Sequence, residues 1–267
     1  MRNPKKPVPF LEFKNVTVMK GCHKKVLDSV SVVISEGEDV AILGPNGAGK
    51  SSLIKTITRE YYPLGGSRDY VFRIWGQETW NIFDLRFRLG IVSNDLQYAY
   101  TRDIRGGDIV LSGFFGSTGL YRRRVSPEMK KKALSVMSFL EIGHLKDRKM
   151  NEMSTGEARR FLIARALVHD PKALILDEPT TSLDIHAIDK FRKIVRKISG
   201  SGIGIVLVTQ SLSDIIPEIS RVVLMKEGRI FQDGPKRSIL TDKNISELFS
   251  VPVRVRQEKG YYHIPGY

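Results

Sequence analysis

The chain has 267 residues, of which 41% are hydrophobic and 27% are charged, and its formal net charge is +14. These values are ordinary for a globular protein with a core, and the length allows one large or two small domains. The single cysteine, Cys22, excludes an internal disulfide and favours a reducing compartment. No apolar run approaches the roughly 20 residues that span a bilayer, and the polar start of the chain resembles no secretory signal. We therefore expect a cytoplasmic protein that reaches the inner face of a membrane only through a partner.

The positive charge is spread along the chain, with small clusters of Lys and Arg in residues 122–124, 130–132 and 190–197. Such a surplus favours an anionic partner, which could be nucleic acid, a ribosome or an acidic membrane face. The alternative is a solvated basic surface without a partner. No aromatic platform and no nucleic-acid motif accompanies the clusters, so both interpretations stay open.

The N-terminal part of the chain predicts strands that lead into a phosphate-binding loop. Strands are expected over residues 10–13, 16–18, 26–34 and 39–43, and a helix over residues 52–60. Between the last strand and the helix stands a Gly, four residues, then Gly-Lys-Ser, which is the pattern of a phosphate-binding loop. The loop consists of Gly44, Pro45, Asn46, Gly47, Ala48, Gly49, Lys50 and Ser51, and Ser52 follows it.

This pattern carries a specific chemistry. The glycines let backbone N–H groups wrap a polyphosphate, and the N-terminus of the following helix favours negative charge. Lys50 is expected to reach the outer phosphates of ATP, and the Ser51 hydroxyl is expected to bind Mg²⁺. A chance Gly-rich turn is the alternative, and the later segments that complete the same site argue against it.

The middle of the chain changes from strands to helices. Residues 71–74 and 89–92 predict strands, and the pattern from residue 101 to about 149 is helical. One helix is expected over residues 128–140. Pro127 is expected at its start and Ser126 as its N-cap.

A second helix is predicted to open in the segment Met153-Ser154-Thr155-Gly156-Glu157. Ser154 can cap this helix, and its first N–H groups together with Gly156 can form an anion site. Alone, the segment is indistinguishable from any capped helix.

The C-terminal third returns to strands, predicted over residues 173–176, 203–208 and 222–225. Near-continuous apolar strands that alternate with helices are typical of a parallel sheet covered on both faces. The helix predicted over residues 188–198 is amphipathic, and its expected core side chains are Ile188, Phe191, Ile194, Val195 and Ile198. In the tail, alternation predicts a strand over residues 251–255 that turns back at Lys259-Gly260 into residues 261–264.

The strand over residues 173–176 ends in two carboxylates, Asp177 and Glu178. Beside a phosphate-binding loop, Asp177 is expected to hold Mg²⁺, directly or through water. Glu178 is expected to orient or deprotonate the attacking water. The alternative is a strand that ends in solvated acids.

Together these segments resemble the ATP-binding cassette (ABC) ATPases over nearly the whole chain. Residues 44–51 resemble the family's Walker A motif, residues 154–157 its signature motif, residues 174–178 its Walker B motif, and residues 182–184, which include Asp184, its D-loop. The resemblance implies an α/β fold: a P-loop NTPase core with a parallel sheet, an N-terminal antiparallel β portion and an inserted helical subdomain.

It also implies a single cassette over residues 10–250. The core is expected over about 10–94 and 165–250, the helical subdomain over about 95–164, and a β-like tail over 251–267.

The resemblance further implies a head-to-tail dimer, with like or unlike cassettes, that sandwiches two ATP molecules. Each γ-phosphate would meet Lys50 of one subunit and Ser154 and Gly156 of the other. Asp184 and Glu157 belong to the same set of nucleotide-site residues.

Several positions depart from the family's pattern. Met19 stands where an aromatic residue usually contacts adenine, and a thioether contacts a ring more weakly. Asn94 replaces the Q-loop glutamine that senses Mg²⁺ and water, with Gln97 nearby as a substitute. Gln210 replaces the switch histidine and can hydrogen-bond a γ-phosphate but cannot carry a proton. Thr155 and Glu157 replace a Gly and a Gln of the signature.

Because Lys50, Asp177 and Glu178 are intact, these departures predict slow ATP hydrolysis rather than none. Residues 56–63 and 110–115 further resemble the ABC ATPases associated with molybdate transport or photorepair.

Three functions follow from these patterns. The first is the energy-supplying subunit of a membrane transporter, bound to a permease near Asn94 and the helical subdomain. The second is a soluble ABC ATPase that acts on nucleic acid or another macromolecule, supported by the positive charge. The third is an ATP-gated dimerisation module, motivated by Met19, Asn94 and Gln210.

Overall fold

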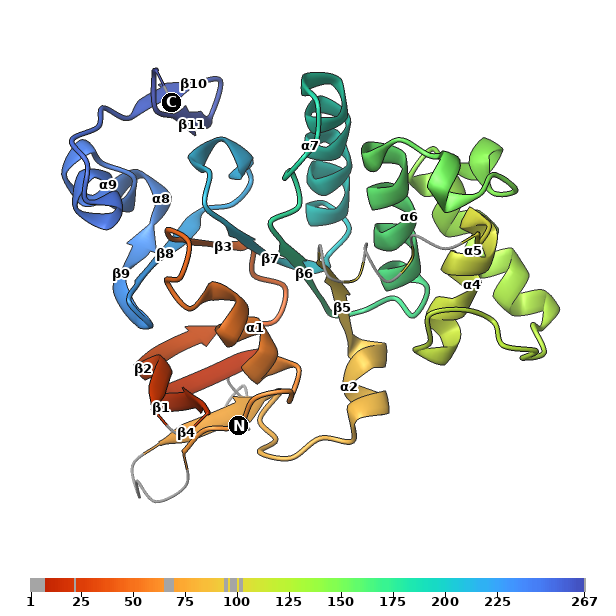
Figure 1. Ribbon diagram of the computed structural model, residues 1–267, viewed down its shortest axis with the longest axis horizontal. Coiled ribbons are helices and arrows are strands. Elements are labelled where there is room, and N and C mark those ends of the chain that lie inside the picture. Colours follow the sequence, from red (N-terminus) through yellow and green to blue (C-terminus); the bar gives the residue numbers. More distant parts are fainter. Residues whose placement is uncertain are drawn as a thin grey trace, which may run out of the picture. The chain divides into compact units, whose positions relative to one another are not determined.

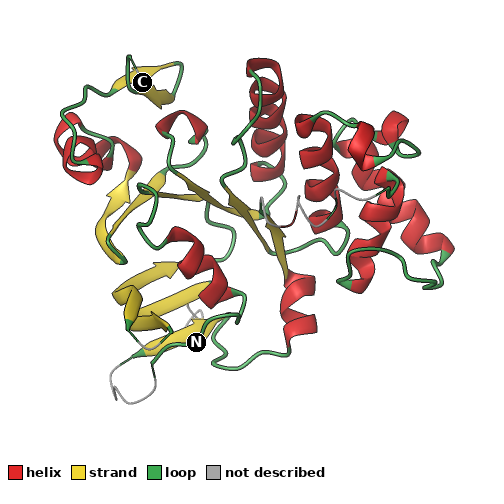
Figure 2. Ribbon diagram, in the orientation of Figure 1, coloured by secondary structure: helices red, strands yellow, loops and turns green. Residues whose placement is uncertain are grey.

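The computed structural model describes residues 8–21, 23–64, 70–93, 96, 100 and 103–266, so Cys22, Asn94 and Gln97 lie outside the described residues. The chain divides into two units, Met1–Ile82 with Gly204–Tyr267, and Phe83–Ile203. Figure 2 shows that strands predominate in the first unit and helices in the second.

The first unit contains an antiparallel sheet of three strands, β1 (Leu11–Lys20), β2 (Lys24–Ile34) and β4 (Val71–Ile74), in the order β2-β1-β4. The sequence predicted two strands where the structure has the single strand β1. A register shift between Phe13 and Val16 explains the difference, because Asn15 takes a positive φ of 52° there while the pairing with β2 resumes beyond it.

The same unit contains four strands in the order β7-β3-β8-β9 (Figure 1). They are β7 (Gly204–Thr209), β3 (Val40–Leu43), β8 (Arg221–Lys226) and β9 (Arg229–Pro235). Strand β3 is parallel to β7 and β8, and β9 returns antiparallel to β8. All residues of β3 and β7 are buried, which explains their continuous apolar sequence. Helix α1 (Lys50–Ile57) follows β3.

The C-terminal part of this unit contains helices α8 (Lys236–Ile239) and α9 (Asp242–Phe249), then the hairpin β10 (Arg256–Glu258) and β11 (Tyr261–His263). The turn predicted at Lys259-Gly260 is confirmed, and the strand predicted over residues 251–255 is wrong. Its amides bond to side chains instead: Val253 N donates to Ser246 Oγ at 2.9 Å, and Val255 N to Asp242 Oδ1 at 2.7 Å.

The second unit has two parallel strands, β5 (Leu89–Val92) and β6 (Ala173–Asp177), with Val92 opposite Leu176. Its helices are α2 (Ile82–Arg88), α4 (Gly106–Ser112), α5 (Pro127–Phe139), α6 (Thr155–Leu167) and α7 (Ile185–Ser199), with short 3₁₀ turns over Gly113–Phe115, Gly143–Leu145 and Met150–Glu152. The predicted helix over residues 128–140 is confirmed as α5, and Ser126 Oγ accepts from Met129 N as its N-cap.

Helix α6 is the centre of the helical packing in the second unit and contacts α4, α5, α7 and β5 (Figure 1). Gly106 of α4 lies so close to Phe161 that a Cβ there would stand 2.5 Å from the ring. On α7, Phe191, Ile194, Val195 and Ile198 are buried as predicted, while Ile188 is only half-buried. None of the helices in the described part of the chain is long and apolar enough to cross a bilayer.

Candidate functional site

The loop after β3 begins in a position that only glycine can occupy. Gly44 is buried and its N–H donates to Thr209 O at 3.2 Å. A Cβ on Gly44 would stand 2.3 Å from Met225 O, so β8 leaves no room for a side chain. The buried strands β7, β3 and β8 therefore fix where the loop starts.

Two further glycines give the loop its curvature. Gly47 has a φ of 80° and Gly49 a φ of 100°, both in the left-handed region that favours glycine. A Cβ on Gly49 would also stand 2.8 Å from Val26 O of β2. The Ala48 carbonyl accepts from Gly228 N at 2.9 Å, so the β8–β9 turn holds the loop from its other side. Sequence reasoning missed Gly228, although a Glu-Gly pair after an apolar strand is a turn signal.

The N-terminus of α1 is open to an anion. Its N-cap is Gly49, no side chain caps the helix, and no acidic residue lies in its first turn. Backbone N–H groups at the start of a helix carry partial positive charge, so the loop and α1 form a cradle that fits a polyphosphate.

Lys50 lies inside this cradle. Its side chain is buried, and Nζ donates to the carbonyls of Gly44 at 2.8 Å and Pro45 at 3.1 Å. The ammonium is therefore held at the loop by the loop's own carbonyls. Ser51 and Asn46 are exposed, and Ser52 and Pro45 are half-buried.

Gln210 lies beside the start of the loop. In the parallel pairing of β3 with β7, Leu43 is opposite Thr209, and Gln210 is the next residue. Gln210 is exposed, and Thr209 Oγ1 donates to Asp214 Oδ2 at 2.5 Å and accepts from Ser211 N at 3.0 Å. The turn after β7 is thereby fixed.

Met19 is half-buried on β1 and pairs with Lys25, the neighbour of Val26, whose carbonyl adjoins Gly49. The first unit thus brings Met19, the loop, Lys50 and Gln210 together.

In the second unit, β6 ends at Asp177 as predicted, and both Asp177 and Glu178 are half-buried. Glu178 has a φ of 48°, which is uncommon for a residue with a side chain. Asn94, two residues beyond the end of β5, lies outside the described residues.

Ser154 caps α6 as the sequence predicted, and Glu157 completes a reciprocal capping box. Ser154 Oγ accepts from Glu157 N at 3.2 Å, and Glu157 Oε2 accepts from Ser154 N at 2.9 Å. Burial acts to raise the pKa of Glu157, but the Ser154 hydrogen bonds and the charges of Arg148 and Arg160 outweigh it and lower that pKa. The glutamate at this position therefore has a local structural reason.

Asp184 caps the next helix of this unit. Its Oδ1 accepts from Ala187 N at 2.7 Å at the start of α7. A Cβ on Gly156 would stand 2.8 Å from the Ala187 Cβ, so the start of α6 packs tightly against α7. The second unit thus brings Gly156, Ser154, Glu157 and the helix capped by Asp184 together.

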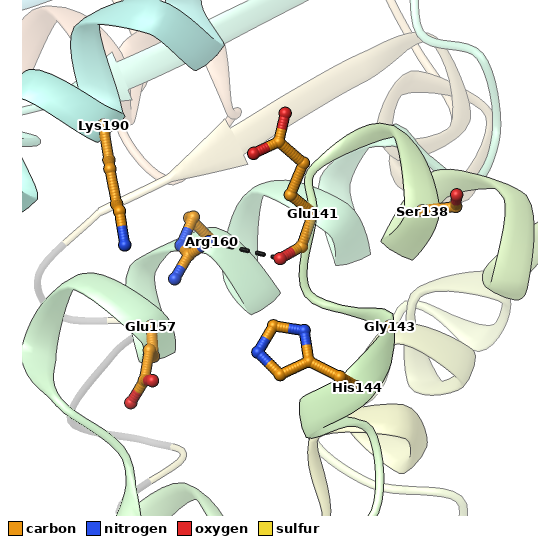
Figure 3. A pocket seen from close by; sticks show the side chains of 7 residues that line it. All are labelled: Ser138, Glu141, Gly143, His144, Glu157, Arg160 and Lys190. Atoms are coloured by element: carbon orange, nitrogen blue, oxygen red, sulfur yellow. Dashed lines mark hydrogen bonds between the residues drawn. The ribbon is translucent and has the colours of Figure 1, made fainter.

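An open polar hollow of about 570 Å³ adjoins Glu157 (Figure 3). Arg160 Nη1 donates across it to Glu141 O at 3.4 Å, and His144 and Lys190 also line it. Cations and carboxylates are mixed in this hollow, so its charge selects no ligand. Among the described residues, no group of three His, Cys, Asp or Glu side chains could hold a metal by itself.

Comparison with known proteins shows which family this chain resembles in sequence. A sequence model described as "ABC transporter" matches residues 27–181. The chain is 33% identical over 92% of both chains to an uncharacterized ABC transporter ATP-binding protein, YlmA, of Bacillus subtilis. It is 30% identical, over 90% of this chain and 88% of the relative, to the hemin import ATP-binding protein HmuV of Bradyrhizobium diazoefficiens. The molybdenum import ATP-binding protein ModC of Mycobacterium tuberculosis is 33% identical over 79% of this chain and 58% of its own length.

Solved structures of ATP-binding cassettes have a similar fold. The ADP conformation of MJ1267, an ATP-binding cassette of an ABC transporter, superposes with a TM-score of 0.77 at 24% identity over 91% of this chain and 98% of that one. The dimeric structure of MJ0796, a bacterial ABC transporter cassette, has a TM-score of 0.67 at 25% identity over 84% of this chain and 98% of that one. The predicted fold class, an α/β fold with a mostly parallel sheet and an antiparallel β portion, is confirmed.

Proposed function

Because the chain belongs to the ABC transporter family, and is therefore an ATP-binding, ATP-hydrolysing protein, we propose that it is the ATPase subunit of an importer whose permease is a separate chain. The observation that carries the proposal is the preformed cradle: left-handed Gly47 and Gly49, an uncapped α1, and Lys50 held at the loop. Import is supported by the names of the relatives from Bradyrhizobium and Mycobacterium.

In this proposal the outer phosphates of ATP replace the Gly44 and Pro45 carbonyls as partners of Lys50 Nζ. The phosphates also accept from the N–H groups of the loop, including Ser51 and Ser52. Met19, beside the loop on β1, contacts the adenine. Mg²⁺ neutralises the developing phosphate charge when it is bound, and Ser51, Asp177 and Asn94 are the residues that would hold it.

Glu178 orients the attacking water and takes its proton, and Gln210 hydrogen-bonds the γ-phosphate. An imidazole in place of the Gln210 amide could also carry a proton. We therefore propose that turnover is slow compared with a cassette that has histidine there.

The cassette acts as a head-to-tail dimer of like or unlike subunits. Ser154 and the first N–H groups of α6 meet the γ-phosphate held by the other subunit, and Gly156, Glu157 and Asp184 belong to the same interface. The dimeric cassette structure supports this arrangement. We also propose that the cassette extends over residues 10–250 and that its helical subdomain lies over about residues 95–164.

The permease is proposed to dock on the second unit near α2. Phe83 and Phe87 of this helix are 61% and 39% exposed. The Phe87 ring contacts the His169 ring at a tilt of 48°, with ring centroids 4.4 Å apart, and the His169 and Phe114 ring centroids are 5.3 Å apart. An exposed aromatic surface of this kind is suited to a partner helix.

Phosphate release by the purified chain tests the ATPase part. Lys50→Ala should abolish release because it removes the buried ammonium at the phosphates. Lys55→Ala removes a positive charge from the same helix, outside the loop, and should leave release unchanged. Equal rates for the two variants would refute the assignment of the cradle. Nucleic-acid-stimulated turnover without a membrane partner would instead support the soluble ATPase.

A further inference from the structure

Two runs of three cations lie close together in the sequence of the second unit, one in the turn before α5 and one in the first half of α5. The basic surface, as we call it, consists of Tyr121, Arg122, Arg123, Arg124, Lys130, Lys131 and Leu134. All seven side chains are exposed. We propose that the basic surface binds the anionic headgroups of a lipid bilayer, so that the cassette touches the membrane directly as well as through its permease.

The charge of this surface is not neutralised locally. Lys132 forms an ion pair with Asp170 at 2.5 Å and is excluded for that reason. The other five cations of residues 121–134 face a single carboxylate in that segment, Glu128, which leaves a charge of +4. Within the described part of the chain, no carboxylate forms an ion pair with Arg122, Arg124, Lys130 or Lys131.

Apolar side chains stand among the cations. Tyr121 is 66% exposed and Leu134 is 48% exposed. On α5 the buried face is formed by Ala133, Val136 and Met137. Leu134 lies outside this face and is exposed, as are Lys130 and Lys131, which are four and three residues before it. Cations that flank an exposed Leu and an aromatic ring are typical of a surface that lies at the headgroup level of a membrane.

The loop that carries the arginines has a defined turn. Arg123 N donates to Leu120 O at 2.7 Å, and the Tyr121 hydroxyl lies 2.9 Å from Thr118 Oγ1. Tyr121 and Arg122 both take a positive φ, of 40° and 61°. The turn presents three consecutive arginines to solvent.

Neighbouring aromatic rings link Arg123 of the basic surface to the proposed permease surface. The Arg123 guanidinium lies 5.4 Å from the Phe115 ring, next to Phe114, which contacts His169 and through it Phe87. A partner that docks at α2 from the membrane would bring the arginines near the lipid headgroups. Nucleic acid would use the cations and the Tyr121 ring, but it gives the exposed Leu134 no role, whereas a membrane interface accepts an apolar side chain.

Vesicle sedimentation with the purified full chain alone tests the proposal without a permease. We expect binding to vesicles that mix phosphatidylcholine with anionic phosphatidylglycerol, and no binding to vesicles of pure phosphatidylcholine. Each Lys or Arg near an anionic surface changes partitioning by about fivefold. The triple variant Arg122→Gln, Arg124→Gln, Lys131→Gln should therefore bind at least about tenfold more weakly.

The matched control removes the same charge from the first unit: Lys243→Gln, Arg254→Gln, Arg256→Gln, all exposed. It should bind the anionic vesicles like the unchanged protein. Equal weakening of both triple variants would overturn the proposal in favour of net charge alone. The proposal would also be overturned if the unchanged protein did not bind anionic vesicles. It would be overturned as well if the first triple variant lost binding to DNA but kept its binding to vesicles.

The variant Leu134→Ser tests the apolar contribution to vesicle binding. It should weaken vesicle binding severalfold while leaving its salt dependence unchanged, because no charge is removed. Unchanged thermal unfolding and phosphate release in all variants would exclude misfolding. These readouts keep failure of the membrane surface distinct from failure of the ATPase assignment.

Discussion

Replacing Ser154 by alanine separates a structural role from a role in the dimer. The change removes the Oγ that accepts from Glu157 N at 3.2 Å and leaves the bond from Ser154 N to Glu157 Oε2. Loss of an N-cap side chain costs about 1 kcal/mol. In a chain of this size, that should lower the unfolding midpoint by about 2–4 °C.

Ser126 provides the matched control. It caps α5 of the same unit, and its Oγ accepts from Met129 N at 3.3 Å. Ser126→Ala should therefore lower the unfolding midpoint by a similar amount. We expect only Ser154→Ala to reduce phosphate release, by about tenfold or more, because only Ser154 is proposed to meet the γ-phosphate of the other subunit.

The assay compares phosphate release with ATP binding to the isolated subunit at several protein concentrations. Ser154→Ala should bind ATP normally as a monomer and lose the rise of specific activity with protein concentration. A loss of activity that is equal in the two serine variants would refute the reasoning, because a cap alone would then explain both.

Three further predictions concern single residues. Gln210→His should raise turnover by about tenfold in a phosphate-release assay, because imidazole can carry a proton; an unaltered or lower rate would show that the missing histidine does not limit hydrolysis. Gly49→Ala should prevent ATP binding and destabilise the fold by about 1–3 kcal/mol, since its Cβ would stand 2.8 Å from Val26 O at a φ of 100°; normal binding measured by calorimetry would contradict the cradle. Glu157 has a lowered pKa, so its carboxylate stabilises the fold above its unfolded value of about 4.3 and this contribution is lost as the pH falls through the lower folded value. Glu157→Gln should therefore flatten the fall in unfolding midpoint below about pH 5, and an unchanged pH profile would show that Glu157 contributes nothing to it.

The conformation of the loop over residues 44–51 was predictable because it depends on local backbone. Gly47 and Gly49 must take positive φ values, and Ser154 and Ser126 can cap helices from their own positions alone. These features therefore depend on residues that are close together in the sequence. The capping box at Glu157 was missed, although Ser154 followed by Glu three residues later is its signature.

Elements that depend on contacts with residues distant in the sequence were harder to predict from the sequence. The alternation of residues 251–255 resembles a strand, but Ser246 and Asp242 of α9 take the amides of Val253 and Val255. Helix α9 itself was not predicted, although Thr241 caps it by accepting from Asn244 N. The role of Gly228 beneath Ala48 needs the β8–β9 turn to return to the loop, which no local pattern encodes.

The measurement that tests the transporter proposal most directly is purification of the chain from its own cells with the change Glu178→Gln. ATP should close this variant into a long-lived dimer, because the residue proposed to activate water is removed. The account predicts that a multi-span membrane protein accompanies it in stoichiometric amount, as identified by mass spectrometry. Recovery of nucleic acid or soluble proteins without a membrane protein would contradict it.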